Sequence, residues 1–104
     1  MQFTVYCNTG KSTVYPLLLD VTSDIIGQLN RRIVIPLLPV EKYPGGTRPE
    51  RLVPLIRLTD DNEYVVMTHE MASIPTRSLG GVFCDASPYR SEVKAAVDFL
   101  LDGI

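Results

Sequence analysis

The apolar residues of this chain change their spacing once, near residue 87. Before that point they occur in short runs rich in β-branched and aromatic residues, and turn-forming residues separate the runs. Runs of this length and spacing predict the strands of a small barrel or sandwich. After that point apolar residues recur at helical spacing and predict one amphipathic helix. The helical stripe consists of Val93, Ala96, Val97, Leu100 and Leu101. The expected fold is therefore mainly β with one C-terminal helix.

Six extended segments are expected before the helix. Their expected ranges are 3–7, 15–21, 32–35, 52–58, 64–68 and 73–79. Pro36 is expected to stop the third segment, because proline cannot donate to a strand ladder. The polar residues 59–63 predict a hairpin turn, and the Pro- and Gly-containing stretch 40–51 predicts an exposed loop. Ser87-Pro88 is expected to start the helix, and Gly103 to end it.

Size and charge exclude several classes of protein. The 104 residues suit a single domain, residues 1–104, and a hydrophobic content of 45% excludes a disordered chain. The 10 Lys and Arg against 12 Asp and Glu give none of the basic excess typical of a nucleic-acid binder. No apolar run approaches the ~18 residues of a membrane span, and the first six residues lack a secretion signal. A cytoplasmic protein with no membrane partner is expected.

The cysteines and the single histidine do not form a recognisable metal site. Cys7 and Cys84 lie far apart, and together with His69 they do not supply four zinc ligands. No metal and no cofactor are therefore expected. Two reduced thiols are favoured over a disulfide, which stays open as an alternative.

No catalytic residue is expected. His69 has Thr68 and Glu70 as sequence neighbours, but adjacent side chains on a strand point to opposite faces. A structural or surface histidine is therefore favoured over a catalytic one. Asp60-Asp61 is interpreted as part of a solvated turn rather than an acid–base pair. No phosphate-binding loop, zinc-protease motif or nucleophile elbow is present.

Two further features leave alternatives open. The basic pair Arg31-Arg32 is compatible with a phosphate contact, an edge charge or an internal ion pair with Asp20. Ile25 and Ile26 are adjacent in an expected loop, where burial inside and exposure at an interface are both compatible with the pattern. The final residue, Ile104, is either a frayed end or an anchor for a partner.

Five stretches of the chain resemble the CcdB family of bacterial toxins. They are MQFTVY (1–6), LDVTSDII (19–26), RRIVIPL (31–37), MTHEMASIP (67–75) and the terminal GI (103–104). They follow the family's order and together span the chain, whereas residues 38–51 and 79–90 look unlike the family. The resemblance implies an SH3-like barrel with a C-terminal helix, as in the CcdB and MazF toxins, and a homodimer.

The resemblance also implies a toxin that is not an enzyme. Such a toxin binds the DNA gyrase A subunit and traps the gyrase–DNA complex with the DNA cut. The gyrase-binding residues implied are Ile25, Ile26, Asp98, Leu101, Asp102, Gly103 and Ile104.

A second implied partner is a CcdA-like antitoxin, a disordered chain that folds on the toxin and neutralises it. Toxin and antitoxin together repress their own operon, and operator DNA is reached only through that complex. The antitoxin-binding residues implied are Asn8, Val14, Tyr43, Tyr64, Met67, Thr68, His69, Glu70 and Met71.

One position departs from the family pattern. Asp102 stands where family members commonly carry a tryptophan before the final Gly-Ile. A carboxylate loses the buried aromatic contact that is typical of binding hot spots. Two alternatives therefore accompany the gyrase-poison hypothesis. One is a MazF-like endoribonuclease on the same fold, and the other is a degenerate toxin that binds antitoxin but binds gyrase only weakly.

Overall fold

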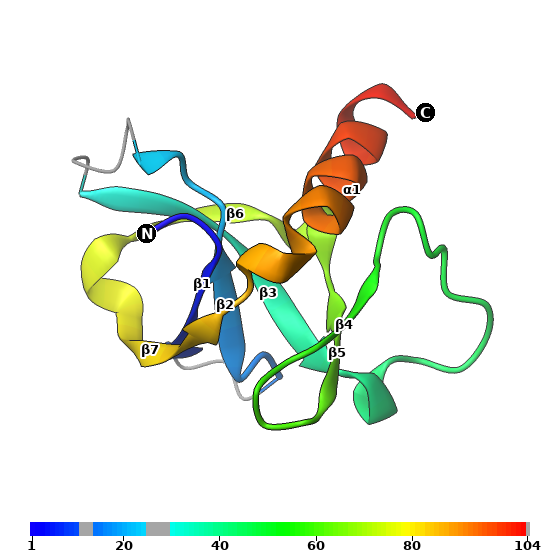
Figure 1. Ribbon diagram of the computed structural model, residues 1–104, viewed down its shortest axis with the longest axis horizontal. Coiled ribbons are helices and arrows are strands. Elements are labelled where there is room, and N and C mark those ends of the chain that lie inside the picture. The colour runs from blue at the N-terminus through cyan, green and yellow to red at the C-terminus, as the bar shows by residue number, and fades with distance from the viewer. Residues whose placement is uncertain (11–13, 25–29, 104) are drawn as a thin grey trace.

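The computed structural model describes residues 1–10, 14–24 and 30–103. Figure 1 shows a strand-rich body from which one helix projects toward the C-terminus. The strands are β1 (Thr4–Asn8), β2 (Leu17–Asp20), β3 (Arg31–Pro39), β4 (Leu55–Arg57), β5 (Glu63–Val66), β6 (Ala72–Pro75) and β7 (Leu79–Asp85). The helix is α1 (Arg90–Asp102). Short 3-10 turns include Val40–Lys42, Thr68–Glu70, Thr76–Ser78 and Ser87–Tyr89.

All of these strands join one antiparallel sheet in the order β4-β5-β3-β2-β1-β7, and β6 pairs separately with β3. The long strand β3 is the centre of the sheet. It pairs with β2 on one side, and on the other with β6 through its first half and β5 through its last residues. The outer strands β4 and β7 do not pair with each other in the described parts of the chain, so the sheet is not closed. The expected class, mainly β and barrel-like with a C-terminal helix, is confirmed.

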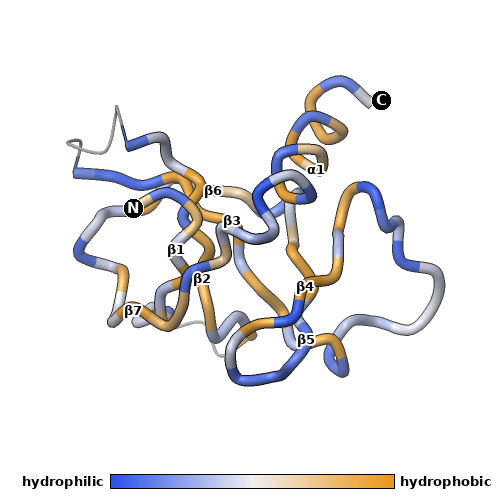
Figure 2. The backbone as a smooth tube through the Cα atoms, in the orientation of Figure 1, coloured by the Kyte–Doolittle hydropathy of each residue, from blue (hydrophilic) through white to orange (hydrophobic). Residues whose placement is uncertain are grey.

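The central strands are buried on both faces. Because alternate side chains of a strand point to opposite faces, Leu37 and Val66 enter one apolar cluster while Leu38 and Val65 enter another. The larger cluster also contains Val93 of α1, so the helix covers this face. The smaller cluster is covered by the segment that follows β3, which contributes side chains from residues 40 to 55. Figure 2 shows the apolar strands of the body against the more polar connections.

The prediction that Pro36 ends the third strand is wrong, because β3 continues to Pro39. The amide of Val21 donates to the carbonyl of Ile33, so the hydrogen-bonded positions that face β2 recur at Ile35 and Leu37. Pro36 falls between them, where no N–H is needed toward β2. On its other side the carbonyl of Pro36 accepts the amide of Met67 at 3.0 Å.

The prediction that residues 73–79 form a single extended segment is also wrong. The chain forms β6, turns at Thr76–Ser78, and continues as β7 through Gly80 and Gly81. Gly80 allows this seventh strand to approach β1 closely, because a Cβ atom there would lie 2.8 Å from the carbonyl oxygen of Cys7. The hairpin around residues 59–63 is confirmed, with the amide of Leu58 donating to the carbonyl of Asn62 at 3.0 Å.

The C-terminal helix is confirmed, with two corrections. It begins at Arg90 rather than at Ser87, because residues 87–89 form a 3-10 turn first. The apolar stripe does not pack along its whole length. Val93 and Ala96 are buried, whereas Leu100 is 37% exposed and Leu101 is 71% exposed. The helix continues past the edge of the body, so its last turns have no sheet beneath them (Figure 1).

Candidate functional site

The last turn of α1 is an exposed surface with a defined end. Asp98, Leu101, Asp102 and Gly103 are all exposed, so the structure places these four predicted gyrase-binding residues on one helix end. Gly103 has a left-handed backbone (φ 73°), and its amide donates to the carbonyl of Phe99 at 2.8 Å. This cap fixes the direction in which the chain leaves the helix. Ile25, Ile26 and Ile104 lie outside the described residues.

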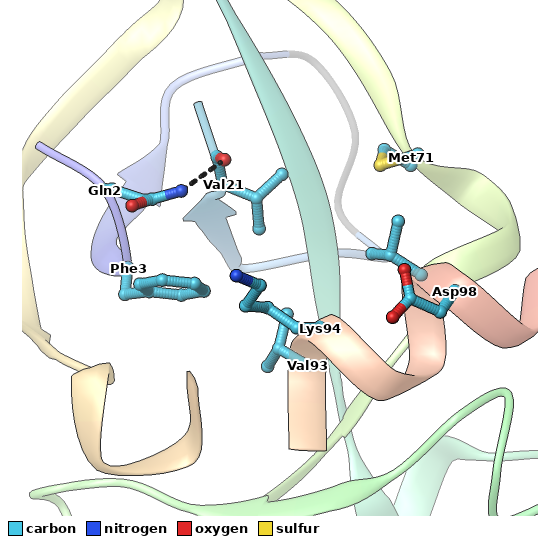
Figure 3. Close-up of a pocket in the computed structure, with 8 residues that line it drawn as sticks. Gln2, Phe3, Val21, Met71, Val93, Lys94 and Asp98 are labelled. Carbon is cyan, nitrogen blue, oxygen red and sulfur yellow. Dashed lines mark hydrogen bonds between the residues drawn. The ribbon is translucent and has the colours of Figure 1, made fainter. Parts of the chain in front are cut away.

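A pocket of about 200 Å³ lies between the first half of α1 and the sheet (Figure 3). Its lining residues are Gln2, Phe3, Val21, Met71, Val93, Lys94, Val97 and Asp98. Gln2 donates from Nε2 to the carbonyl of Val21 at 3.3 Å and closes one side. The pocket brings together Asp98 and Met71, which the resemblance assigns to two different partners. The exposed helix end is therefore continuous with an apolar hollow in the body.

A second surface surrounds the smaller apolar cluster. Met67 and Tyr43, both predicted to bind the antitoxin, meet in this cluster, and Tyr15 packs against it beside them. Tyr64 instead faces the larger cluster, and Thr68 is fully buried. Tyr15 was not among the predicted antitoxin-binding residues, although it directly follows the predicted Val14.

Tyr15, which precedes β2, lies near the 3-10 turn at residues 68–70. Asn8 shapes the β1–β2 connection by donating from Nδ2 to the carbonyl of Tyr15 at 2.9 Å and by accepting the amide of Gly10 at 2.9 Å. Burial and the nearby charge of Glu70 raise the pKa of Tyr15. Val14 is 53% exposed. Tyr15 and Glu70 are therefore close enough to interact electrostatically, although they are far apart in the sequence.

His69 is a surface residue, as expected. The assumption that it and its neighbours lie on a strand is wrong. Residues 68–70 form a 3-10 turn rather than a strand, and His69 and Glu70 are both exposed. The Nε2 atom of His69 lies 3.8 Å from Oε1 of Glu70. The neighbouring Thr68 is buried and donates at 3.4 Å to the carbonyl of Val66, so it does not join them.

Of the alternatives for the basic pair Arg31-Arg32, an internal ion pair with Asp20 is confirmed for Arg32. Its Nε lies 2.8 Å and its Nη2 2.7 Å from Oδ2 of Asp20, and both side chains are buried. The amide of Thr22 donates to the other carboxylate oxygen at 2.9 Å. The neighbouring Arg31 is exposed and donates to the hydroxyl of Ser73 at 2.8 Å.

Asp60 belongs to a polar turn, as predicted. The hydroxyl of Tyr64 donates to it at 2.7 Å and the amide of Asn62 at 3.1 Å. Burial opposes ionisation, but these hydrogen bonds outweigh it and lower the pKa of Asp60. The carboxylate is thus occupied in holding the turn.

Residues 1–10, 14–24 and 30–103 contain two free cysteines and no metal site. Cys7 is exposed, Cys84 is buried, and both are free thiols. In these ranges no cluster of three or more His, Cys, Asp or Glu residues is placed to hold a metal ion. Nor does any helix there have the length and apolar character to cross a membrane.

The sheet, the capped helix end and the surface around the smaller cluster define a small, mainly β protein with exposed surfaces suited to protein partners. The family model described as CcdB protein matches residues 2–103, and the chain therefore belongs to the CcdB family. The match includes residues 38–51 and 79–90, which had looked unlike the family. Members of this family are toxins of toxin–antitoxin systems, so the broad functional class expected from the resemblance is confirmed.

Proposed function

We propose that this protein is a gyrase-directed toxin of a type II toxin–antitoxin pair. Residues 1–104 act as one toxin domain that binds the DNA gyrase A subunit and traps the cleaved gyrase–DNA complex, without catalysing a reaction itself. The observation that carries the proposal is the exposed helix end, where Leu101 is 71% exposed and Asp98 and Asp102 are exposed on the same turn. Exposed apolar side chains grouped on a surface and bordered by polar groups are typical of protein interaction sites.

The gyrase-binding surface comprises this helix end together with Ile25, Ile26 and Ile104. Gly103 contributes by directing the chain end through its cap. Asp98 joins the helix end to the pocket in Figure 3, where its carboxylate stands at the side of the hollow nearest the last turns of α1. Asp102 takes the position of the family's usual aromatic residue and offers a charge for a basic group on the partner.

A CcdA-like antitoxin neutralises the toxin on the surface around the smaller apolar cluster. Val14, Tyr43, His69 and Glu70 offer accessible groups, with Tyr15 packed among them. Met67 is buried in the cluster and supports this surface from below, whereas Tyr64 and Thr68 are buried elsewhere in the fold and do not contact the partner first. Met71, in the pocket of Figure 3, forms the boundary toward the helix.

Three further parts of the proposal follow from the same family. The toxin is a homodimer, which is supported by the apolar side chain that α1 leaves partly exposed at Leu100. It acts in the cytoplasm, where gyrase is found. It co-represses its operon with the antitoxin, and operator DNA is bound through that complex. Sedimentation at micromolar concentration tests the dimer, and a monomer there would contradict it.

The direct experiment is capture of purified gyrase A by the purified toxin, together with a DNA supercoiling assay. Retention of gyrase A and accumulation of cut DNA are expected. The informative variant is Leu101→Glu, which should abolish both effects. Its control is Val82→Glu, since Val82 is 69% exposed in β7 and outside the proposed surface.

The same protein preparation decides between the proposal and its alternatives. Cleavage of RNA by the purified chain would favour the MazF-like endoribonuclease. Antitoxin binding without retention of gyrase A would identify the degenerate toxin instead.

A further inference from the structure

Arg51 joins the loop before β4 to the exposed half of the helix. Its guanidinium carbon lies 4.6 Å from the centre of the Phe99 ring. A cation at this distance over an aromatic face is attracted by the ring's electrons. Phe99 belongs to the turn of α1 that follows the last buried residue, Ala96, where the sheet no longer supports the helix. The contact therefore supports the helix in the region where core packing ends.

The backbone that carries Arg51 is itself fixed. The amides of Leu52 and Val53 both donate to the carbonyl of Pro49 at 3.0 Å, which makes a tight turn around Arg51. The side chain of Val53 is fully buried in the smaller cluster. The guanidinium of Arg48 donates to the carbonyl of Val53 and holds the same turn from the other side. Arg51 thus projects from a rigid base.

Negative charge on α1 also favours the position of the Arg51 guanidinium over the Phe99 ring. A hollow of about 340 Å³ separates the loop from α1. It is lined by Glu50, Arg51, Pro54, Glu92, Ala95 and Asp98. Two of its three carboxylates, Glu92 and Asp98, are on the helix, so their field draws the cation of Arg51 toward α1.

Phe99 transmits this support to the helix end. Its carbonyl is the acceptor of the Gly103 amide, the hydrogen bond that closes the C-terminal cap. Leu100, Leu101 and Asp102 lie between these two residues. Holding the Phe99 ring therefore holds the whole capped turn.

We propose that Arg51 is a positioning residue that orders the last turn of α1 for partner binding through its contact with Phe99. The part of the proposal that concerns gyrase rests on the proposed function, whereas the ordering of the helix end does not. The sequence offered no signal for this contact, because 48 positions separate the two residues and the loop was expected to be exposed.

Five variants test the proposal in the full chain, and one of them combines Arg51→Ala with Phe99→Leu. Arg51→Ala removes the cation, and Phe99→Leu keeps an apolar side chain without the aromatic face. Arg51→Lys retains a cation, and Arg77→Ala is the control for the loss of one exposed positive charge elsewhere. The measurements are hydrogen exchange of the amides of residues 100–103, affinity for gyrase A by calorimetry, and the melting temperature.

Arg51→Ala and Phe99→Leu should each speed exchange of these amides and weaken gyrase A binding by roughly two- to five-fold, the range expected for an exposed cation–π contact. The double variant should lose no more than either single one, because both remove the same contact. Arg51→Lys should retain most of the affinity, and the melting temperature should change little in every case.

Two results would overturn the positioning role: exchange rates in Arg51→Ala equal to those in Arg77→Ala, or fully additive losses in the double variant. If the unaltered protein does not bind gyrase A, the proposed function fails. The exchange measurement still decides the role of Arg51.

Discussion

Arg32 places two nitrogen atoms on one carboxylate oxygen of Asp20, with Nε at 2.8 Å and Nη2 at 2.7 Å, in a region closed to solvent. The pair joins the end of β2 to the start of β3. Both side chains are buried, so the pair is a structural support between two strands, and its charges are not available to a partner.

Neutralising Asp20 should destabilise the fold strongly. Asp20→Asn leaves the buried guanidinium of Arg32 without its counter-charge, and breaking a buried pair in this way costs about 3–5 kcal/mol. Urea unfolding measures the loss. The control is Asp61→Asn, which breaks the exposed pair with Arg57 and should cost less than about 1 kcal/mol. Equal losses in the two variants would contradict a structural role for the buried pair.

The two adjacent glycines of β7 should differ in their tolerance of alanine. A Cβ atom at Gly80 would lie 2.8 Å from the carbonyl oxygen of Cys7, whereas at Gly81 it would meet nothing within 4 Å. Gly80→Ala should therefore lower the free energy of unfolding by about 1–3 kcal/mol, as overpacking usually does. Gly81→Ala should change it by less than about 1 kcal/mol. Thermal unfolding of the two variants compares them, and a stable Gly80→Ala protein would show that β7 can move away from β1.

Alkaline pH should weaken the fold through Tyr64. Burial, together with the hydrogen bond to Asp60, raises the pKa of Tyr64 to about 12. The unfolded tyrosine has a pKa of about 10, so the folded state favours the neutral phenol. The resulting stabilisation is complete below pH 10 and disappears between pH 10 and 12. Unfolding free energies across that range should fall less steeply for Tyr64→Phe than for the unaltered protein. Identical slopes would rule out this origin of the pH dependence.

Asp102→Trp should strengthen binding to gyrase A. The position is exposed on the last turn of α1, so the helix accommodates a large side chain without disturbing the core. An aromatic residue adds apolar contact area at the centre of the proposed surface, and such residues dominate many interfaces. Calorimetry with gyrase A measures the change, with melting temperature as the check on folding. Unchanged or weaker binding would mean that the helix end is not the contact surface.

The strands and the helix could be predicted because their signals are local. The strands were signalled by short runs of β-forming residues bounded by turn residues, and the helix by its apolar stripe. Pro36 was misinterpreted because its effect depends on register, and the register of β3 against β2 is set by tertiary pairing. The last positions of the stripe, Leu100 and Leu101, have the correct helical period but no sheet beneath them. Periodicity predicts the direction of an apolar face and not the presence of a partner for it.

The candidate site could be predicted only in part. The terminal Gly-Ile, one of the stretches that resemble the CcdB family, indicated the helix end as a binding surface, because its two residues are adjacent in the sequence. Two interactions could not be predicted: that of Tyr15 with Glu70, and that of Arg51 with Phe99. Each forms between segments that are distant in the sequence and meet only in the folded chain. Tyr15 follows the predicted Val14 in the sequence, but its packing against the cluster that contains Met67 depends on the tertiary structure.

The central claim is that the end of α1 binds gyrase A, and removal of residues 103–104 tests it most directly. The buried contacts of the helix are made by Val93 and Ala96, so the melting temperature and antitoxin binding should be nearly unchanged. Loss of a central anchor costs ~2 kcal/mol or more in binding, which is roughly a thirty-fold drop in affinity. Titration of the truncated toxin into gyrase A should therefore show affinity reduced by about that factor or more. Full affinity in a normally folded truncated protein would contradict the account.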